Sequence, residues 1–233
     1  MIRAKIFGIS LPLLVLATTG HAGTFTFETA VGAKESGGNA VDGKAIVTTN
    51  AATGTVTVQL FNLLVNPTTV AQNISDFDFT LVGVTGGTLS SSSGQEITVA
   101  SNGSFTTGSN VTTGWVLSGS GSYILNVLGT ATAPSHTILG APGAGGTYSN
   151  ANSGIAGNDP HNPFLNQTAT FTITGLTGLT ANTVVSNVIF SFGTDAGNNV
   201  PGGGSSVPEP VSLSLVGGGL LALGLLRKRL PRQ

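Results

Sequence analysis

The chain has no cysteine and little charge: Asp, Glu, Lys and Arg make up only 7% of its 233 residues. Without cysteine there is no disulfide, and thiol chemistry and thiolate metal sites are excluded. Aromatic residues are also few, at 6%, and include one tryptophan and two tyrosines. A stable domain must therefore be built from an aliphatic and phenylalanine core within regular secondary structure.

Positive charge is nearly absent from the interior of the sequence. Between residues 23 and 210 only Lys34 and Lys44 are basic, against nine acidic residues, which gives this region a net charge of −7. Nucleic-acid binding depends on Lys and Arg side chains that neutralise phosphates, so no nucleic-acid partner is expected.

The last 27 residues follow a three-part pattern. Val207-Pro208-Glu209-Pro210 precedes an apolar run over 211–226, and Arg227, Lys228 and Arg229 follow it. The run is 16 residues long. As a helix it would span about 24 Å, short of the roughly 30 Å of a bilayer core, which makes it a marginal anchor. A basic cluster directly after such a run is typical of a stop-transfer signal, so we predict a transmembrane helix over 211–226.

The N-terminus has the pattern of a secretory signal peptide. Arg3 and Lys5 form a positive region, residues 6–17 an apolar region, and Gly20-His21-Ala22 a small-x-small cleavage site. We predict passage through the Sec translocon and cleavage by signal peptidase between Ala22 and Gly23. Before processing, both ends would lie in the inner membrane, with the region between them on its far side.

The C-terminal pattern resembles the PEP-CTERM sorting signal of exported proteins from Gram-negative bacteria that make extracellular polysaccharide. The resemblance rests on Pro208, Glu209 and Pro210, on the apolar run and on the basic tail. It implies that an integral-membrane exosortase recognises the Pro-Glu-Pro motif and removes the helix and tail. These residues would then be a recognition site and not a catalytic one. The resemblance covers residues 207–233 and implies no activity for the rest of the chain.

The region between these two ends contains apolar residues that alternate with Thr, Ser, Gln and Asp. The alternation is clearest over residues 24–28, 55–60, 76–81, 170–174 and 188–192. A period of two places apolar side chains on one face of a strand and polar ones on the other. Gly, Ser and Asn clusters separate the segments, and no long helical period is present. We therefore predict an all-β fold, an antiparallel β-sandwich of jelly-roll type.

The expected organisation has four parts. They are a signal peptide (1–22), one β-sandwich domain (23–197), a Gly/Ser linker (198–206) and the sorting signal (207–233). The linker prediction rests on Gly202-Gly203-Gly204-Ser205-Ser206, a composition typical of flexible tethers.

Few residues offer catalytic chemistry. His136 and His161 are the only histidines between residues 23 and 206, and neither G-x-S-x-G nor H-E-x-x-H occurs. Asp76 and Asp78 share one strand face and could pair as in glycoside hydrolases, but a solvated outer face explains them more simply. We expect a non-enzymatic protein, with a surface hydrolase dependent on His161 as a less favoured alternative.

Two ligand hypotheses remain. Asp159, in a loop over 158–163, could bind Ca²⁺ with help from Asp195, although turn capping explains this loop without a metal and no cofactor is expected. Trp115, Tyr123 and Tyr148 could form an aromatic platform for a glycan, although Trp115 and Tyr123 fit a core equally well.

The expected function follows from sorting and composition. We expect an exported structural protein of the cell surface or extracellular matrix, associated with exopolysaccharide in a biofilm. The alternative is a carbohydrate-binding or adhesion module.

Overall fold

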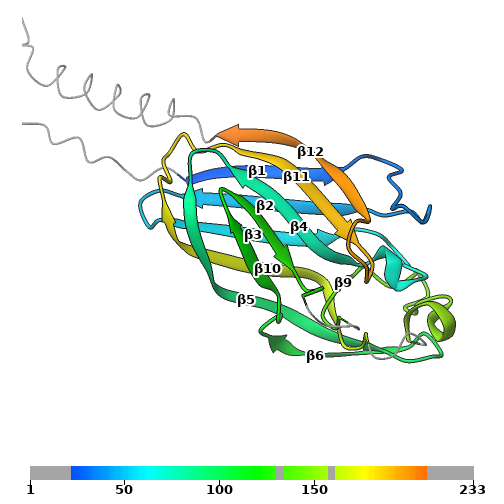
Figure 1. The fold of residues 1–233 in the computed structure, drawn as a ribbon. Coiled ribbons are helices and arrows are strands. Elements are labelled where there is room, and N and C mark those ends of the chain that lie inside the picture. Colours follow the sequence, from blue (N-terminus) through cyan, green and yellow to red (C-terminus); the bar gives the residue numbers. More distant parts are fainter. Residues whose placement is uncertain (1–21, 130–133, 157–160, 209–233) are drawn as a thin grey trace, which may run out of the picture.

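The computed structural model describes residues 22–129, 134–156 and 161–208. Strands dominate this part of the chain, and its only helices are two short turns, η1 (Val70–Gln72) and η2 (Ala151–Ile155). The strands are β1 (Ala22–Thr29), β2 (Gly43–Asn50), β3 (Thr55–Asn62), β4 (Ile74–Leu81), β5 (Thr85–Val99), β6 (Phe105–Val111), β7 (Val116–Ser120), β8 (Ser122–Asn126), β9 (Ile138–Leu139), β10 (Phe164–Thr177), β11 (Val185–Phe192) and β12 (Asn199–Pro208). The all-β class is confirmed, and all five alternating segments lie within strands (Figure 1).

The strands form one continuous sheet that closes on itself. The order is β6-β5-β10-β3-β2-β1-β12-β11-β4-β8-β7, and β9 pairs with both β10 and β4. The short strand β9 thereby completes a ring of eight strands: β10, β3, β2, β1, β12, β11, β4 and β9. The predicted sandwich is not confirmed, because two separate sheets would leave a break in the hydrogen bonding that this ring does not have.

Two pairs of strands extend from the ring. β5 and β6 continue the sheet beyond β10, and β8 and β7 continue it beyond β4 (Figure 1).

The core consists of the apolar faces of the alternating strands. Phe77, Phe171 and Phe190 are completely buried, and the rings of Phe77 and Phe190 pack with centroids 5.2 Å apart. Such tilted aromatic pairs add to the free energy gained from burying their area. A second buried cluster, which includes Leu139 and Phe164, lies where β9 meets β10.

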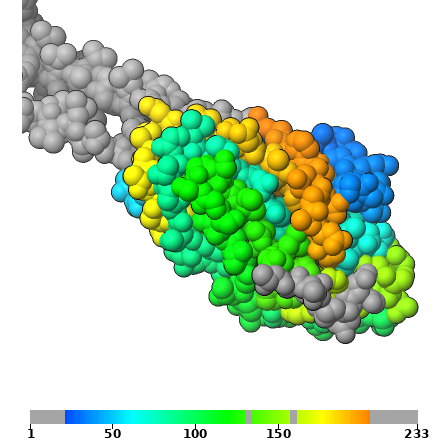
Figure 2. Space-filling view, in the orientation of Figure 1, coloured from blue at the N-terminus to red at the C-terminus, as the bar shows by residue number. Residues whose placement is uncertain are grey.

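The structure differs from the predicted linker over 198–206. β12 pairs with β1 from Gly23 opposite Pro208 to Thr29 opposite Gly202, and with β11 on its other side. Figure 2 shows β12, in orange, on the surface of the body beside the blue N-terminal segment. The linker prediction is therefore wrong for β12, since this segment is a strand of the ring with a paired strand on each side.

The physical reason lies in the side chains on either side of β12. A Cβ atom at Gly204 would lie 2.3 Å from the ring of Phe27, and one at Gly202 would lie 2.7 Å from Val188. Glycine at these positions makes room for large neighbours on β1 and β11. The glycine run reflects packing, not flexibility.

The predicted membrane segments lie outside the described residues. These are residues 1–21 of the signal peptide, the apolar run 211–226, and the residues Glu209, Pro210, Arg227, Lys228 and Arg229. Within the described ranges, no helix has the length and apolar character needed to cross a membrane.

Candidate functional site

The three polar aromatics do not form a surface platform. Trp115, Tyr123 and Tyr148 are 4%, 1% and 2% exposed. Each donates a hydrogen bond of 2.9 Å from its polar edge to a backbone carbonyl oxygen. Glycan stacking needs an exposed ring face, so the platform hypothesis is wrong and these residues belong to the core.

The Ca²⁺ hypothesis stays a prediction. Asp159 lies outside the described residues, and Asp195 is an exposed residue in the turn between β11 and β12. No further acidic, histidine or cysteine residues gather into a metal-binding group within the described ranges.

A pair of acidic side chains on β4 is the first chemically distinctive feature. Asp76 and Asp78 occupy the same face of the strand, as the alternation predicts, while Phe77 and Phe79 point into the core. The prediction of a solvated face was incomplete, because both carboxyls are partly buried and each has a buried Oδ1 atom with no hydrogen bond.

Burial changes the acidity of this pair. It raises the pKa of Asp76, and the negative charge of Asp78 raises it further, to about 7. Burial also raises the pKa of Asp78. Like charges this close favour a state in which the pair keeps one proton.

The neighbours of the pair are uncharged. Asn126 on β8 and Ser191 on β11 stand opposite Asp76, and Ile124 and Ile189 stand opposite Asp78. Among the described residues, no cation therefore compensates these carboxyls in the sheet. The pair can hold a proton near neutral pH.

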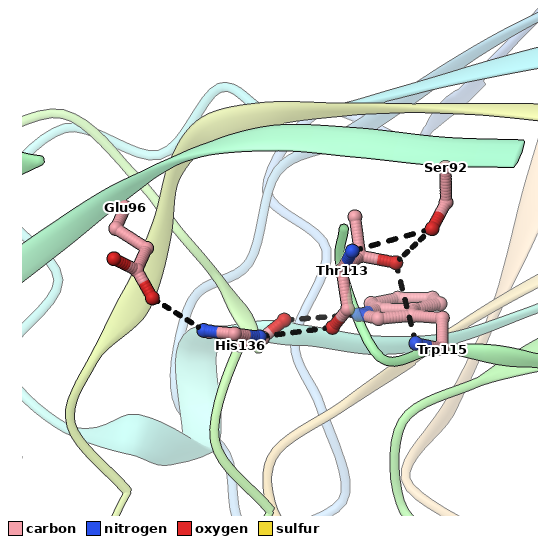
Figure 3. A network of polar contacts seen from close by, with 5 residues as sticks. All are labelled: Ser92, Glu96, Thr113, Trp115 and His136. Atoms are coloured by element: carbon pink, nitrogen blue, oxygen red, sulfur yellow. Dashed lines mark hydrogen bonds and ion pairs between the residues drawn. The ribbon is translucent and has the colours of Figure 1, made fainter. Parts of the chain in front are cut away.

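A second polar network joins β5 to the segments before β7 and β9 (Figure 3). His136 Nε2 lies 3.0 Å from Glu96 Oε1, and His136 Nδ1 lies 3.0 Å from the carbonyl oxygen of Thr113. Thr113 Oγ1 in turn lies 2.8 Å from Ser92 Oγ and accepts a hydrogen bond from the backbone N–H of Trp115.

This network fits a structural role. Both atoms that face the imidazole ring are acceptors, so a doubly protonated ring satisfies both contacts and a neutral ring only one. A hydrolase would need a serine hydroxyl on one of these nitrogens, but a backbone carbonyl occupies that place. The indole N–H of Trp115 donates to the carbonyl oxygen of His136, which binds the network to the core.

Replacing His136 with alanine is expected to destabilise the fold by about 1–2 kcal/mol, because two hydrogen bonds are lost and Glu96 keeps a half-buried carboxylate without its partner. Urea unfolding can be followed by the fluorescence of Trp115, the single tryptophan. A double-mutant cycle with Glu96→Ala should show a coupling of about 0.5–1 kcal/mol. Fully additive effects would contradict a direct His136–Glu96 interaction.

The other histidine, His161, contacts a backbone carbonyl oxygen. His161 Nδ1 lies 3.1 Å from the carbonyl oxygen of Pro134. Within the described ranges, its ring has no hydrogen bond to a serine hydroxyl or a carboxylate. Among the described residues, no catalytic triad is thus assembled around His161, and the hydrolase alternative stays a prediction.

Sequence reasoning found the Asp76–Asp78 pair but missed the Glu96–His136 contact. The pair is visible because residues two apart on a strand share a face. The contact joins residues from separate elements, and no local pattern marks it.

Comparison with known protein families, with curated proteins and with solved structures finds no match to this chain. Its function must accordingly be argued from its own residues.

Proposed function

We propose that this chain is an exported, non-enzymatic protein of the cell surface or extracellular matrix, delivered by PEP-CTERM sorting in a Gram-negative bacterium. Its partners during export are the Sec translocon, signal peptidase and an exosortase. It is an inner-membrane-anchored precursor first and becomes part of a polysaccharide matrix after processing.

One observation carries this proposal: Gly23 stands opposite Pro208 in the β1–β12 ladder. Gly23, the first residue of the expected mature chain, therefore lies beside Pro208, the first residue of the Pro-Glu-Pro motif, where β1 and β12 pair. Cleavage before Gly23 and just after the Pro-Glu-Pro motif would remove both membrane segments and keep all of β12. Every residue of the β1–β12 ladder, from Gly23 to Pro208, would then lie within the expected mature region, which supports the proposal.

The surface composition is consistent with a matrix role. Many outward positions on β3, β7 and β10 are Thr, Ser, Asn or Gln. Such groups exchange hydrogen bonds with water and with polysaccharide hydroxyls at little cost. The net charge of −7 between residues 23 and 210 favours solubility outside the cell.

Peptide mass spectrometry of both termini tests the proposal, on protein recovered separately from the membrane, the cell surface and the medium of the native host. The expected product begins at Gly23, ends near Pro210 and lies outside the cell. Replacing Glu209 with alanine should leave the chain uncut, because the resemblance places Glu209 in the recognition motif. An intact chain to Gln233 confined to the membrane would contradict the proposal.

A further inference from the structure

A bulge in β10 opens a polar groove on the outside of the sheet. Leu165 pairs with Glu96 and Ala169 pairs with Gly94, so three residues of β10 lie opposite the single residue Gln95 of β5. Gln167, within the bulge, has a left-handed φ of 62°. Bulges of this kind interrupt the ladder and redirect side chains, and they occur often beside binding sites.

The groove has a volume of about 400 Å³, within the range of roughly 300–1,000 Å³ for ligand sites. It spans three neighbouring strands, β10, β5 and β6. Its lining consists of Ser93, Gly94, Gln95, Asn110, Asn166, Thr168, Ala169 and Thr170. Six of these eight residues carry an amide or hydroxyl side chain, and none carries a charge.

Some of these polar groups are held in place by the protein. Asn166 Nδ2 donates to Gln95 Oε1 at 2.9 Å, and Gln95 Nε2 donates to the carbonyl oxygen of Gly108 at 3.3 Å. These bonds orient one wall of the groove before any ligand arrives, which lowers the entropy cost of binding.

Other polar groups in the groove have no protein partner. Among the described residues, the side chains of Ser93, Asn110 and Thr170 make no hydrogen bond. Asn110 stands opposite Gln95, and Thr170 stands opposite Ser93. Two rows of donors and acceptors therefore cross the groove, and together they can bind several hydroxyl groups at once.

The charges nearby decide which ligands fit. Glu96, next to the groove, is engaged by His136, and Lys44 is paired with Glu28 at 2.8 Å on the β1–β2 side of the ring. Among the described residues, no basic side chain lines the groove to receive a carboxylate, sulfate or phosphate group. A neutral ligand rich in hydroxyls matches this lining, and an acidic polysaccharide does not.

We propose that the groove between β10, β5 and β6 is a binding site for a segment of neutral glycan. The site recognises hydroxyl groups by hydrogen bonds from amides and hydroxyls, without the aromatic platform that the sequence offered as one hypothesis. This inference deepens the proposed matrix function and rests on it, because it names the class of polysaccharide that the exported protein contacts.

Calorimetric and NMR titrations of the purified exported protein test this site. The probes are cellohexaose, laminarihexaose, xylohexaose and mannohexaose as neutral oligosaccharides, and hexagalacturonate as an acidic one. At least one neutral probe should bind at millimolar concentration or below, whereas hexagalacturonate should not. Binding by none of the neutral probes, or preference for hexagalacturonate, would overturn the inference.

Two variants connect binding to the groove. Asn110→Ala and Thr170→Val should each weaken binding of the neutral probe about three- to tenfold, because each removes hydrogen-bonding groups that face the ligand. Asn182→Ala, at an exposed position in the turn before β11, is the matched control and should bind as the parent does. Unchanged binding in both groove variants would also overturn the inference.

Failure of glycan binding in the groove can be distinguished from failure of the proposed sorting. A chain processed at both termini and found in the matrix, yet without affinity for neutral probes, would refute the groove and leave sorting intact. A chain that binds these probes but remains uncut in the membrane would refute sorting and leave the groove intact.

Discussion

Replacing Gly204 with alanine is expected to destabilise the protein by about 2–3 kcal/mol, the range for overpacking a well-ordered core. The same change at Gly203 should be neutral or stabilise slightly. A Cβ atom at Gly204 would lie 2.3 Å from two carbons of the Phe27 ring, closer than any real contact. Phe27 is only 7% exposed, so its ring has little freedom to move aside.

Gly203 is the matched control for this prediction. Its Cβ atom would meet only the carbonyl oxygen of Glu28, at 3.7 Å, which is an ordinary contact. Both changes reduce the freedom of the unfolded chain in the same way, by about 0.4–1 kcal/mol. The difference between them therefore isolates the clash with Phe27.

Urea unfolding of the two variants provides the measurement, with limited proteolysis as a second readout. Because β12 lies between β1 and β11 in the ring, Gly204→Ala should also make this strand more accessible to protease. Equal stability of the two variants would show that residues 199–208 do not pack as a strand against Phe27, and would restore the linker interpretation.

The second large effect concerns Asp76. Asp76→Asn is expected to stabilise the protein at pH 8 by about 2 kcal/mol and to have little effect at pH 4. The pKa of Asp76 rises from 3.8 to about 7 through burial and the charge of Asp78. The full shift would correspond to about 4 kcal/mol, and solvent screening of a residue that is partly exposed reduces this by about half.

The direction follows from proton linkage. The folded state holds a proton on Asp76 at pH values where the unfolded state has released it. The contribution of this group to stability is therefore complete below pH 4 and is lost as pH rises through about 7. Asparagine keeps the shape of the side chain and removes the titration. The facing residues on β8 and β11 include no other charge, so Asp78 is the main partner.

Urea unfolding at both pH values tests this prediction. Asp195→Asn, at an exposed position, is the control and should change stability little at either pH. A stabilisation by Asp76→Asn that is the same at pH 4 and pH 8 would show that the carboxyl does not titrate differently in the folded and unfolded states.

Features that depend on a few consecutive residues could be predicted from the sequence, and features that depend on contacts between distant segments could not. The strands around Phe25, Val58, Phe77 and Phe171 were predicted because alternation of apolar and polar residues is a property of a few consecutive positions. The shared face of Asp76 and Asp78 follows from the same period. Their burial does not, because it depends on β8 and β11, which lie on either side of β4.

The errors have a common physical origin. Gly202–Ser206 has the composition of a tether, and only the neighbouring rings of Phe27 and Phe190 show why glycine is needed there. Trp115 and Tyr148 were considered for a glycan platform because they are polar-edged aromatics, although Trp115 was judged to fit a core equally well. The fold instead supplies backbone carbonyl oxygens that satisfy those edges in the core.

The sequence by itself determined the all-β class, the positions of the main strands and the absence of disulfides. It also supplied the terminal patterns that predict export and the expectation that no nucleic acid binds. These follow from local periodicity and from composition, which can be read without knowing which distant segments pack together. Only the tertiary structure decided that β9 closes the ring, that β12 belongs to it, that the aromatics are buried, and that the β10 bulge opens a polar groove. Each of these depends on contacts between distant segments, and such contacts come into being only when the chain folds.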